Sequence, residues 1–264
     1  MEKIDIEKIK KVAIDAVFAA GTELAQRYDK YSRADFKLKS FHEIVTAADV
    51  ASEKIILGAI KKNFPTHRIL SEEAGANKKQ SDFLWVVDPL DGTHNFSMHN
   101  PLWAVSVALF YDEEPVLGLI FAPLLGEFYF AETGGGAYVN GKQLKVSKID
   151  HDNAINTFCH GSKIADIKKA LKYCSYQKLN NFDARQLGSA ALEMAYVASG
   201  RVESLFIPGV HAWDVAAGVL MVREAGGVVT DFKNKFWTTK SKDILASNGV
   251  IHANILQTIK KIKI

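Results

Sequence analysis

The spacing of apolar residues divides the chain into two stretches of different character. In the first, a long helical repeat over residues 5–28 precedes strand-like apolar runs separated by short polar turns. In the second, strand-like and helical runs alternate. The pattern predicts a layered α+β and α/β sandwich. We expect a single domain, 1–264, with an α+β half over about 1–150 and an α/β half over about 151–264.

The same spacing predicts the elements of the first half. A second helix is expected to open at Asp49 and to end at Pro65. The polar stretch before it, around Lys39 and His42, is expected to be an exposed loop. Strands, the later ones forming an antiparallel meander, are expected at 68–70, 84–87, 103–111, 115–122, 127–131, 137–139 and 143–146.

The second half is predicted to mix strands with helices, and the apolar face of the helix expected at 189–199 is made mostly of small residues. Gly226 and Gly227 are expected to end the helix that starts at Trp213. The other expected elements are strands at 154–159, 202–207 and 228–230, and helices at 164–173, 189–199 and 251–262.

The amino-acid composition limits the classes of function that we expect for this protein. The 264 residues include 33 basic and 30 acidic ones. The resulting formal charge of +3 is too small to indicate nucleic-acid binding. Two cysteines, Cys159 and Cys174, form neither a disulfide framework nor a CxxC motif. The charged N-terminus lacks the apolar core of a signal peptide, and no stretch is long enough to span a bilayer. We therefore expect a cytoplasmic protein with no membrane partner.

The candidate chemistry lies just after the apolar run 84–87. Asp88 is held in an extended conformation by Pro89, and Asp91 follows one turn later. Gly92 leaves the backbone open to a ligand, and Thr93 offers an N–H and a hydroxyl at the start of a helix. This combination predicts an anion site beside two carboxylates.

Carboxylates next to an anion site repel a phosphate unless cations lie between them. Hard divalent ions are implied, and Mg²⁺ is commonly held by a few carboxylates together with substrate phosphate. The alternative is an ordinary turn, because Asp-Pro and Asp-Gly pairs also mark turns that bind nothing.

The segment from Asp88 to Thr93, with Glu72-Glu73 before it and Trp213-Asp214 after it, resembles the inositol monophosphatase family of Mg²⁺-dependent, lithium-sensitive phosphatases. The resemblance runs from Val45 to Asn248 and implies hydrolysis of a small phosphorylated alcohol by direct attack of metal-activated water. It also implies a homodimer.

The resemblance assigns roles to individual residues. It implies up to three Mg²⁺ ions held by Glu72, Asp88, the Leu90 carbonyl, Asp91 and Asp214. It implies catalytic roles for Asp49, Thr93 and Glu72, and substrate or phosphate contacts for Asp91, Gly92, Thr93, Ala190 and Ile207. Without it, Asp49 is an ordinary helix N-cap. Lys39 is the nearest match to a lysine in the family's mobile loop, and Arg185 is either structural or close to substrate.

The sequence does not determine which phosphate ester is the substrate. The family carries a glutamate that binds inositol hydroxyls at the position of Ile207, and isoleucine offers no acceptor. Related phosphatases act on histidinol phosphate, fructose 1,6-bisphosphate or 3′-phosphoadenosine nucleotides. A function of another class, a regulatory binding protein in a transcription or ribosome complex, is also known among bacterial members of the family.

Overall fold

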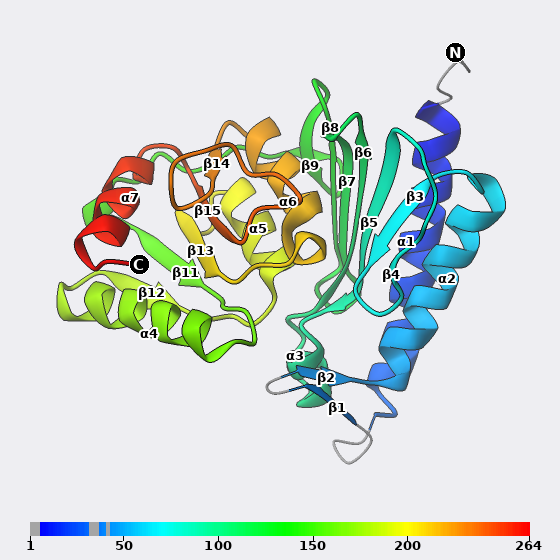
Figure 1. Ribbon diagram of the computed structural model, residues 1–264, viewed down its shortest axis with the longest axis horizontal. Helices are drawn as coiled ribbons and strands as arrows, with labels where there is room; N and C mark the ends of the chain where they lie inside the picture. The colour runs from blue at the N-terminus through cyan, green and yellow to red at the C-terminus, as the bar shows by residue number, and fades with distance from the viewer. Residues whose placement is uncertain (1–5, 32–36, 41–42) are drawn as a thin grey trace.

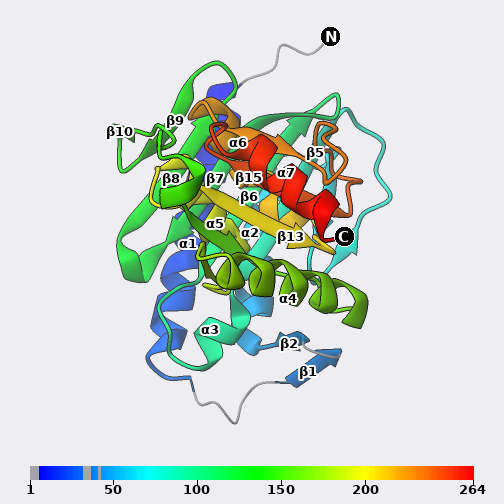
Figure 2. The ribbon, with the colours of Figure 1, turned by 90° about the vertical axis from the view of Figure 1, so that its left-hand side faces the viewer.

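The computed structural model describes residues 6–31, 37–40 and 43–264, which form alternating layers of helix and sheet (Figure 1). One pair of helices covers the outer face of an eight-stranded sheet, a second pair lies between the two sheets, and a third covers the outer face of a five-stranded sheet (Figures 1 and 2). The helices outside the eight-stranded sheet are α1 (Ile6–Tyr28) and α2 (Ala47–Asn63). Those between the sheets are α5 (Ala190–Ala198) and α6 (Ala212–Glu224). Those outside the five-stranded sheet are α4 (Ile164–Leu179) and α7 (His252–Lys261).

The larger sheet has the order β10-β9-β8-β7-β6-β5-β3-β4, and only its β3–β5 pair is parallel. Its strands are β3 (Arg68–Ser71), β4 (Gly75–Ala76), β5 (Phe83–Asp91), β6 (Ala104–Tyr111), β7 (Glu114–Ala122), β8 (Glu127–Glu132), β9 (Gly136–Val139) and β10 (Lys142–Gln143). Short 3₁₀ helices at Pro123–Leu125 and His151–Asn153 and the five-residue helix α3 (Thr93–Ser97) complete this half.

The smaller sheet has the order β12-β11-β13-β15-β14. Its strands are β11 (Ile155–Phe158), β12 (Asp183–Arg185), β13 (Ser204–Pro208), β14 (Val228–Thr230) and β15 (Asp243–Ser247). β11 runs parallel to β12 and β13, whereas β15 is antiparallel to both of its neighbours. The sheet is therefore mixed, because β15, which the apolar pattern did not predict, enters it in the opposite direction.

Side chains of β5 alternate between two layers of the core, as expected for a strand covered on both faces. Trp85 and Val87 pack with α1 and α2, whereas Val86 packs with α5 and α6. The third cluster lies between the smaller sheet and its outer helices, where the rings of Tyr173 and Phe206 stack at 4.1 Å. β5 is consequently fixed in the interior, and its carboxyl end carries the candidate chemistry.

Three predictions for the first half need correction. The expected loop around Lys39 contains a hairpin of β1 (Lys37–Ser40) and β2 (Glu43–Val45), of which only the backbone is described, and His42 lies outside the described residues. α2 begins at Ala47 rather than Asp49, because Thr46 is the N-cap. β5 continues past Asp88 to Asp91, since it resumes pairing with β6 after Pro89.

The other boundaries differ less. α4 continues to Leu179, beyond the predicted end at residue 173, and β12 was not expected. Both differences arise at the surface, where apolar spacing is weak and Leu179 is 84% exposed. Among the helices described, none has the length and apolar character that a membrane crossing requires.

Candidate active site

The carboxyl end of β5 brings two acids into the interior. Asp88 pairs with Ser106 of β6 and Asp91 with Ala104, so three steps along β5 match two along β6. The additional residue is a bulge, which re-aims the side chains that follow it. Asp88 is 2% exposed and Asp91 7%. The Asp88 carboxylate accepts a hydrogen bond from the Leu90 N–H at 3.0 Å.

Asp49 reaches the same place from the first turn of α2. It is the third residue of the helix, where its carboxylate accepts hydrogen bonds from the Thr46 N–H at 2.8 Å and from the Thr46 hydroxyl at 2.6 Å. Its other oxygen lies 3.1 Å from Thr93 Oγ1. Burial raises the pKa of Asp49 to about 6 against these hydrogen bonds, and the charge of Glu73 adds to the rise. The capping role expected of Asp49 therefore belongs to Thr46, and Asp49 forms the reciprocal half of a capping box.

Thr93 lies where the turn becomes α3. Its single hydroxyl proton has two acceptors, Asp49 and the Leu90 carbonyl, at 3.1 and 3.0 Å. Gly92 precedes it with φ 88°, and a Cβ atom there would lie 2.9 Å from the Leu102 carbonyl oxygen. Only glycine fits this turn without strain. The first N–H groups of α3 have no side-chain cap.

Asp91 joins the two halves of the chain. Its carboxylate accepts hydrogen bonds from the Ser189 hydroxyl and from the N–H groups of Ala190 and Ala191, at 3.2 and 2.9 Å. These groups form the N-terminus of α5, which favours a negative charge. Burial is still the largest influence and raises the pKa of Asp91 to about 6.

Two further acids complete the group. Asp214 lies in the first turn of α6 and accepts a hydrogen bond from the His211 N–H at 2.9 Å. Glu72 follows β3, and its N–H donates to the Val87 carbonyl at 3.1 Å. Burial raises the pKa of Asp88 well above its usual value, and the charges of Glu72, Asp91 and Asp214 raise it further. The four predicted carboxylates therefore form one electrostatic group around Asp88.

The donor set suits a hard cation. In the part of the chain that the structure describes, no three His, Cys, Asp or Glu side chains already form a cage for an ion. Asp88, Asp91 and Asp214 instead accept hydrogen bonds from backbone N–H groups. The pKa of Asp88 is raised by burial and further by the charges of the other three acids. A divalent ion that drew them together would relieve this repulsion, and carboxylate and carbonyl oxygens are its preferred ligands. The residues present therefore fit the predicted metal.

The remaining predicted residues lie either at the border of this group or away from it. Ala190, the first residue of α5, borders it through the hydrogen bond from its N–H to Asp91. Ile207 is 2% exposed and pairs with Ile244 inside the core layer between the sheets. Arg185 forms an ion pair with Asp183 at 3.0 Å on the strand β12. The side chain of Lys39 lies outside the described part of the structure.

Sequence reasoning missed the residues that hold the turn at 187–189. Glu193, fully buried on α5, accepts hydrogen bonds from the N–H groups of Leu187 and Gly188 at 3.1 and 3.0 Å. From the other half, the Asn95 side chain donates to the Leu187 carbonyl at 2.8 Å. A single acid among the small apolar residues of an otherwise buried helix was the available signal for Glu193.

The chain is similar to known proteins in its sequence and in its fold. Residues 5–263 match the inositol monophosphatase family. The chain is 38% identical to a Nus factor SuhB of Pasteurella multocida, over 94% of each chain, and 38% identical to a fructose-1,6-bisphosphatase/inositol-1-monophosphatase of Thermotoga maritima, over 86% of each. The solved inositol monophosphatase of Anabaena (Nostoc) sp. superposes with a TM-score of 0.84 at 32% identity, over 97% of each chain.

The fold and the clustered acids define a phosphoric monoester hydrolase of a metal-dependent class. The chain belongs to the inositol monophosphatase family. The family resemblance and the layered fold class predicted from the sequence are thereby confirmed.

Proposed function

We propose that the protein uses Mg²⁺ to hydrolyse small phosphorylated alcohols, with Glu72, Asp88, the Leu90 carbonyl, Asp91 and Asp214 as metal ligands. The observation that carries the proposal is the hydrogen bond from Thr93 Oγ1 to Asp49, formed next to the buried group of acids. When bound, Mg²⁺ acts as a Lewis acid on the phosphate oxygens and makes a coordinated water more acidic.

We propose that residues of the protein itself orient the attacking water and bind the phosphate. Thr93 donates its one hydroxyl proton to Asp49 or to Leu90, which leaves its oxygen lone pairs free to accept a hydrogen bond from water. Asp49, with its pKa raised to about 6, suits proton acceptance near neutral pH. The N–H groups of Gly92 and Thr93 are proposed to hold the phosphate, since the glycine leaves the backbone accessible. Because the site draws on both halves of the chain, we propose that residues 1–264 act as one domain.

A phosphatase panel in the presence of Mg²⁺ tests this function. The substrates are inositol 1-phosphate, fructose 1,6-bisphosphate, histidinol phosphate, a 3′-phosphoadenosine nucleotide and glycerol 2-phosphate. We expect hydrolysis of several of them, with weak preference for inositol 1-phosphate because Ile207 offers no acceptor, and inhibition by Li⁺. A folded protein that hydrolyses none of them would refute the proposal, and a strong preference for one would define the substrate.

The similarity to a protein named Nus factor favours a second candidate, a regulatory partner in a transcription complex. Affinity capture from cell extract with the wild type and with Asp49→Asn separates the two functions. A transcription protein captured equally by both variants supports the regulatory role, and its absence from both captures argues against that role. The homodimer and the cytoplasmic location stay predictions, and light scattering at micromolar concentration tests the first.

A further inference from the structure

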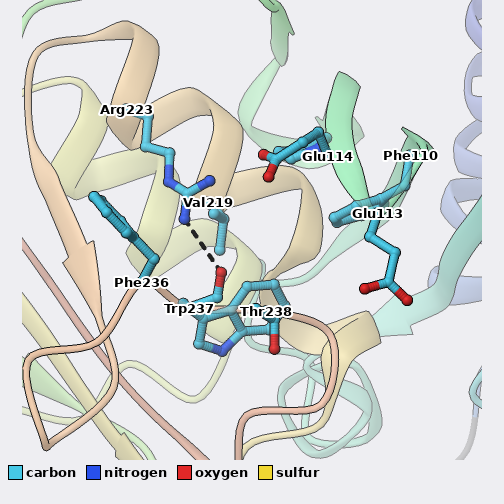
Figure 3. Close-up of a pocket in the computed structure, with 9 residues that line it drawn as sticks. Phe110, Glu113, Glu114, Val219, Arg223, Phe236, Trp237 and Thr238 are labelled. Carbon is cyan, nitrogen blue, oxygen red and sulfur yellow. Dashed lines mark hydrogen bonds between the residues drawn. The ribbon is translucent and has the colours of Figure 1, made fainter.

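A cavity of about 310 Å³ lies at the end of α6 opposite to Asp214. Figure 3 shows the side chains that line it. Arg223 lines it from the last turn of α6, nine residues after Asp214, which corresponds to about 14 Å along a helix. The cavity is therefore separate from the candidate active site. Its volume is that of a site for a small metabolite.

The main polar feature of this cavity is the half-buried guanidinium of Arg223. A guanidinium carries five N–H donors. The structure gives Arg223 one hydrogen bond, from Nη2 to the Trp237 carbonyl at 3.2 Å, and pairs it with no carboxylate among the described residues. Its burial lowers the pKa of Arg223, which the charge of Glu114 partly offsets. Donors of a desolvated cation thus remain available to a ligand.

The other walls combine an acid with apolar surface. Figure 3 shows the guanidinium between the ring of Phe236 and the carboxylate of Glu114. Phe110 and Val219 add apolar surface, and Phe236 is 84% exposed at the rim. A cavity that presents a cation, a carboxylate and apolar side chains together fits a ligand with the complementary three parts.

These walls also exclude a second site for the substrate. A phosphate dianion would meet the carboxylate of Glu114 in the same small space, whereas the Glu113 carboxylate is paired with Lys240 at 3.0 Å. A carboxylate carries half that charge and forms two parallel hydrogen bonds with a guanidinium. An ammonium group on the same ligand would turn Glu114 from a source of repulsion into a partner.

We propose that this cavity binds a free amino acid with an apolar side chain: its carboxylate on Arg223, its ammonium group beside Glu114, and its side chain against Phe110 and Phe236. The site is independent of the phosphatase centre. Because Arg223 and Asp214 belong to one helix, an occupant would contact the element that carries a predicted metal ligand.

Calorimetric titration of the full-length protein without substrate tests the proposal. The probes are L-phenylalanine and L-leucine, with 3-phenylpropionate, which lacks the ammonium group, and phenethylamine, which lacks the carboxylate. We expect one amino acid to bind per chain and both incomplete compounds to bind at least tenfold more weakly, because each leaves one charge of the cavity unpaired. Failure of both amino acids to bind at millimolar concentration would overturn the proposal, as would equal binding of 3-phenylpropionate and L-phenylalanine.

Variants locate the binding. Arg223→Gln is expected to weaken L-phenylalanine binding at least tenfold, whereas Arg27→Gln, on α1, leaves it unchanged. Glu114→Gln, at an exposed position, is expected to remove the discrimination against 3-phenylpropionate without affecting the fold. Melting curves show whether Arg223→Gln remains folded. If Arg223→Gln does not fold, the Glu114→Gln variant tests the proposal instead. If that variant still binds 3-phenylpropionate much more weakly than L-phenylalanine, the proposed ammonium contact is contradicted.

Discussion

The carboxylate of Asp91 accepts a hydrogen bond from the N–H of Ala191 at 2.9 Å, although the two residues lie 100 positions apart. The bond connects the end of β5 in the larger sheet to the first turn of α5 in the layer between the sheets. The candidate metal site is therefore formed where the halves meet, and neither half contains all of its acids.

Removal of divalent cations is expected to abolish hydrolysis, and added Mg²⁺ to restore it. Burial raises the pKa of Asp88 and the charges of the neighbouring acids raise it further, so the group would repel a phosphate dianion without cations among its members. The measurement is turnover of glycerol 2-phosphate after EDTA treatment and dialysis, with circular dichroism as the control for folding. An undiminished rate in metal-stripped protein would show that the mechanism is wrong.

Asp91→Asn is expected to lose activity and the response to metal while keeping the fold. The amide oxygen of asparagine still accepts the Ala191 hydrogen bond, but the negative charge that holds the cation is gone. Mg²⁺ should raise the melting temperature of the wild type and not that of the variant, because an ion that binds only the folded state stabilises it. Ser189→Ala, which keeps the carboxylate, is the matched control and should retain the Mg²⁺ response. Near-wild-type turnover in Asp91→Asn would remove this residue from the site.

Thr93→Val is expected to lower kcat by roughly 10²–10⁴-fold, the usual contribution of a positioned proton-transfer group. Valine keeps the branched shape but can neither donate to Asp49 nor orient a water. Thr93→Ser retains the hydroxyl and should keep most of the activity. Steady-state kinetics of both variants decide the matter, since equal rates for valine and serine would mean that the hydroxyl takes no part.

Ile207→Glu is expected to increase the preference for inositol 1-phosphate over glycerol 2-phosphate roughly tenfold, by restoring an acceptor for a hydroxyl. Ile207 is 2% exposed, so the glutamate will also lower stability. The ratio of kcat/KM for the two substrates does not depend on the fraction of folded protein and is the proper measurement. Ile207→Leu serves as the control, and an unchanged ratio in the glutamate variant would show that the position does not select substrate.

Glu193 predicts a pH dependence of stability. Burial raises its pKa from 4.5 to about 7, so the folded state binds this proton more tightly than the unfolded chain. Its contribution to stability is therefore fully present below about pH 4.5 and is lost as the pH rises to about 7, by roughly 3 kcal/mol in total. The measurement is the free energy of unfolding in urea at pH 5 and at pH 8. Glu193→Gln should lose less of this free energy between the two pH values than the wild type does, because glutamine has no proton to release.

Glu23→Gln, at a partly exposed position on α1, is the control for Glu193→Gln and should keep the wild-type pH dependence. Equal losses of stability in the wild type and in Glu193→Gln between the two pH values would contradict the raised pKa.

The sequence by itself determined the family, the layered fold class and the local chemistry of the segment from Asp88 to Thr93. These are set by neighbouring residues: a buried run ends in two acids, and a glycine turn leads into a helix. The apolar pattern also located most helices and the meander, because it is strong wherever one face of an element is buried.

Only the tertiary structure decided which distant residues meet. The contact of Asp91 with α5, the Asp49–Thr93 hydrogen bond and the anchoring of the turn at 187–189 by Glu193 depend on how the layers pack, which local spacing does not encode. The structure also shows that Thr46, and not Asp49, is the N-cap of α2. The carboxylate of Asp49, in the first turn, accepts a hydrogen bond from the Thr46 N–H instead. The Arg223 cavity likewise exists only where α6 packs against the start of β7 and the segment of Trp237, three parts of the chain whose side chains meet only in the folded protein.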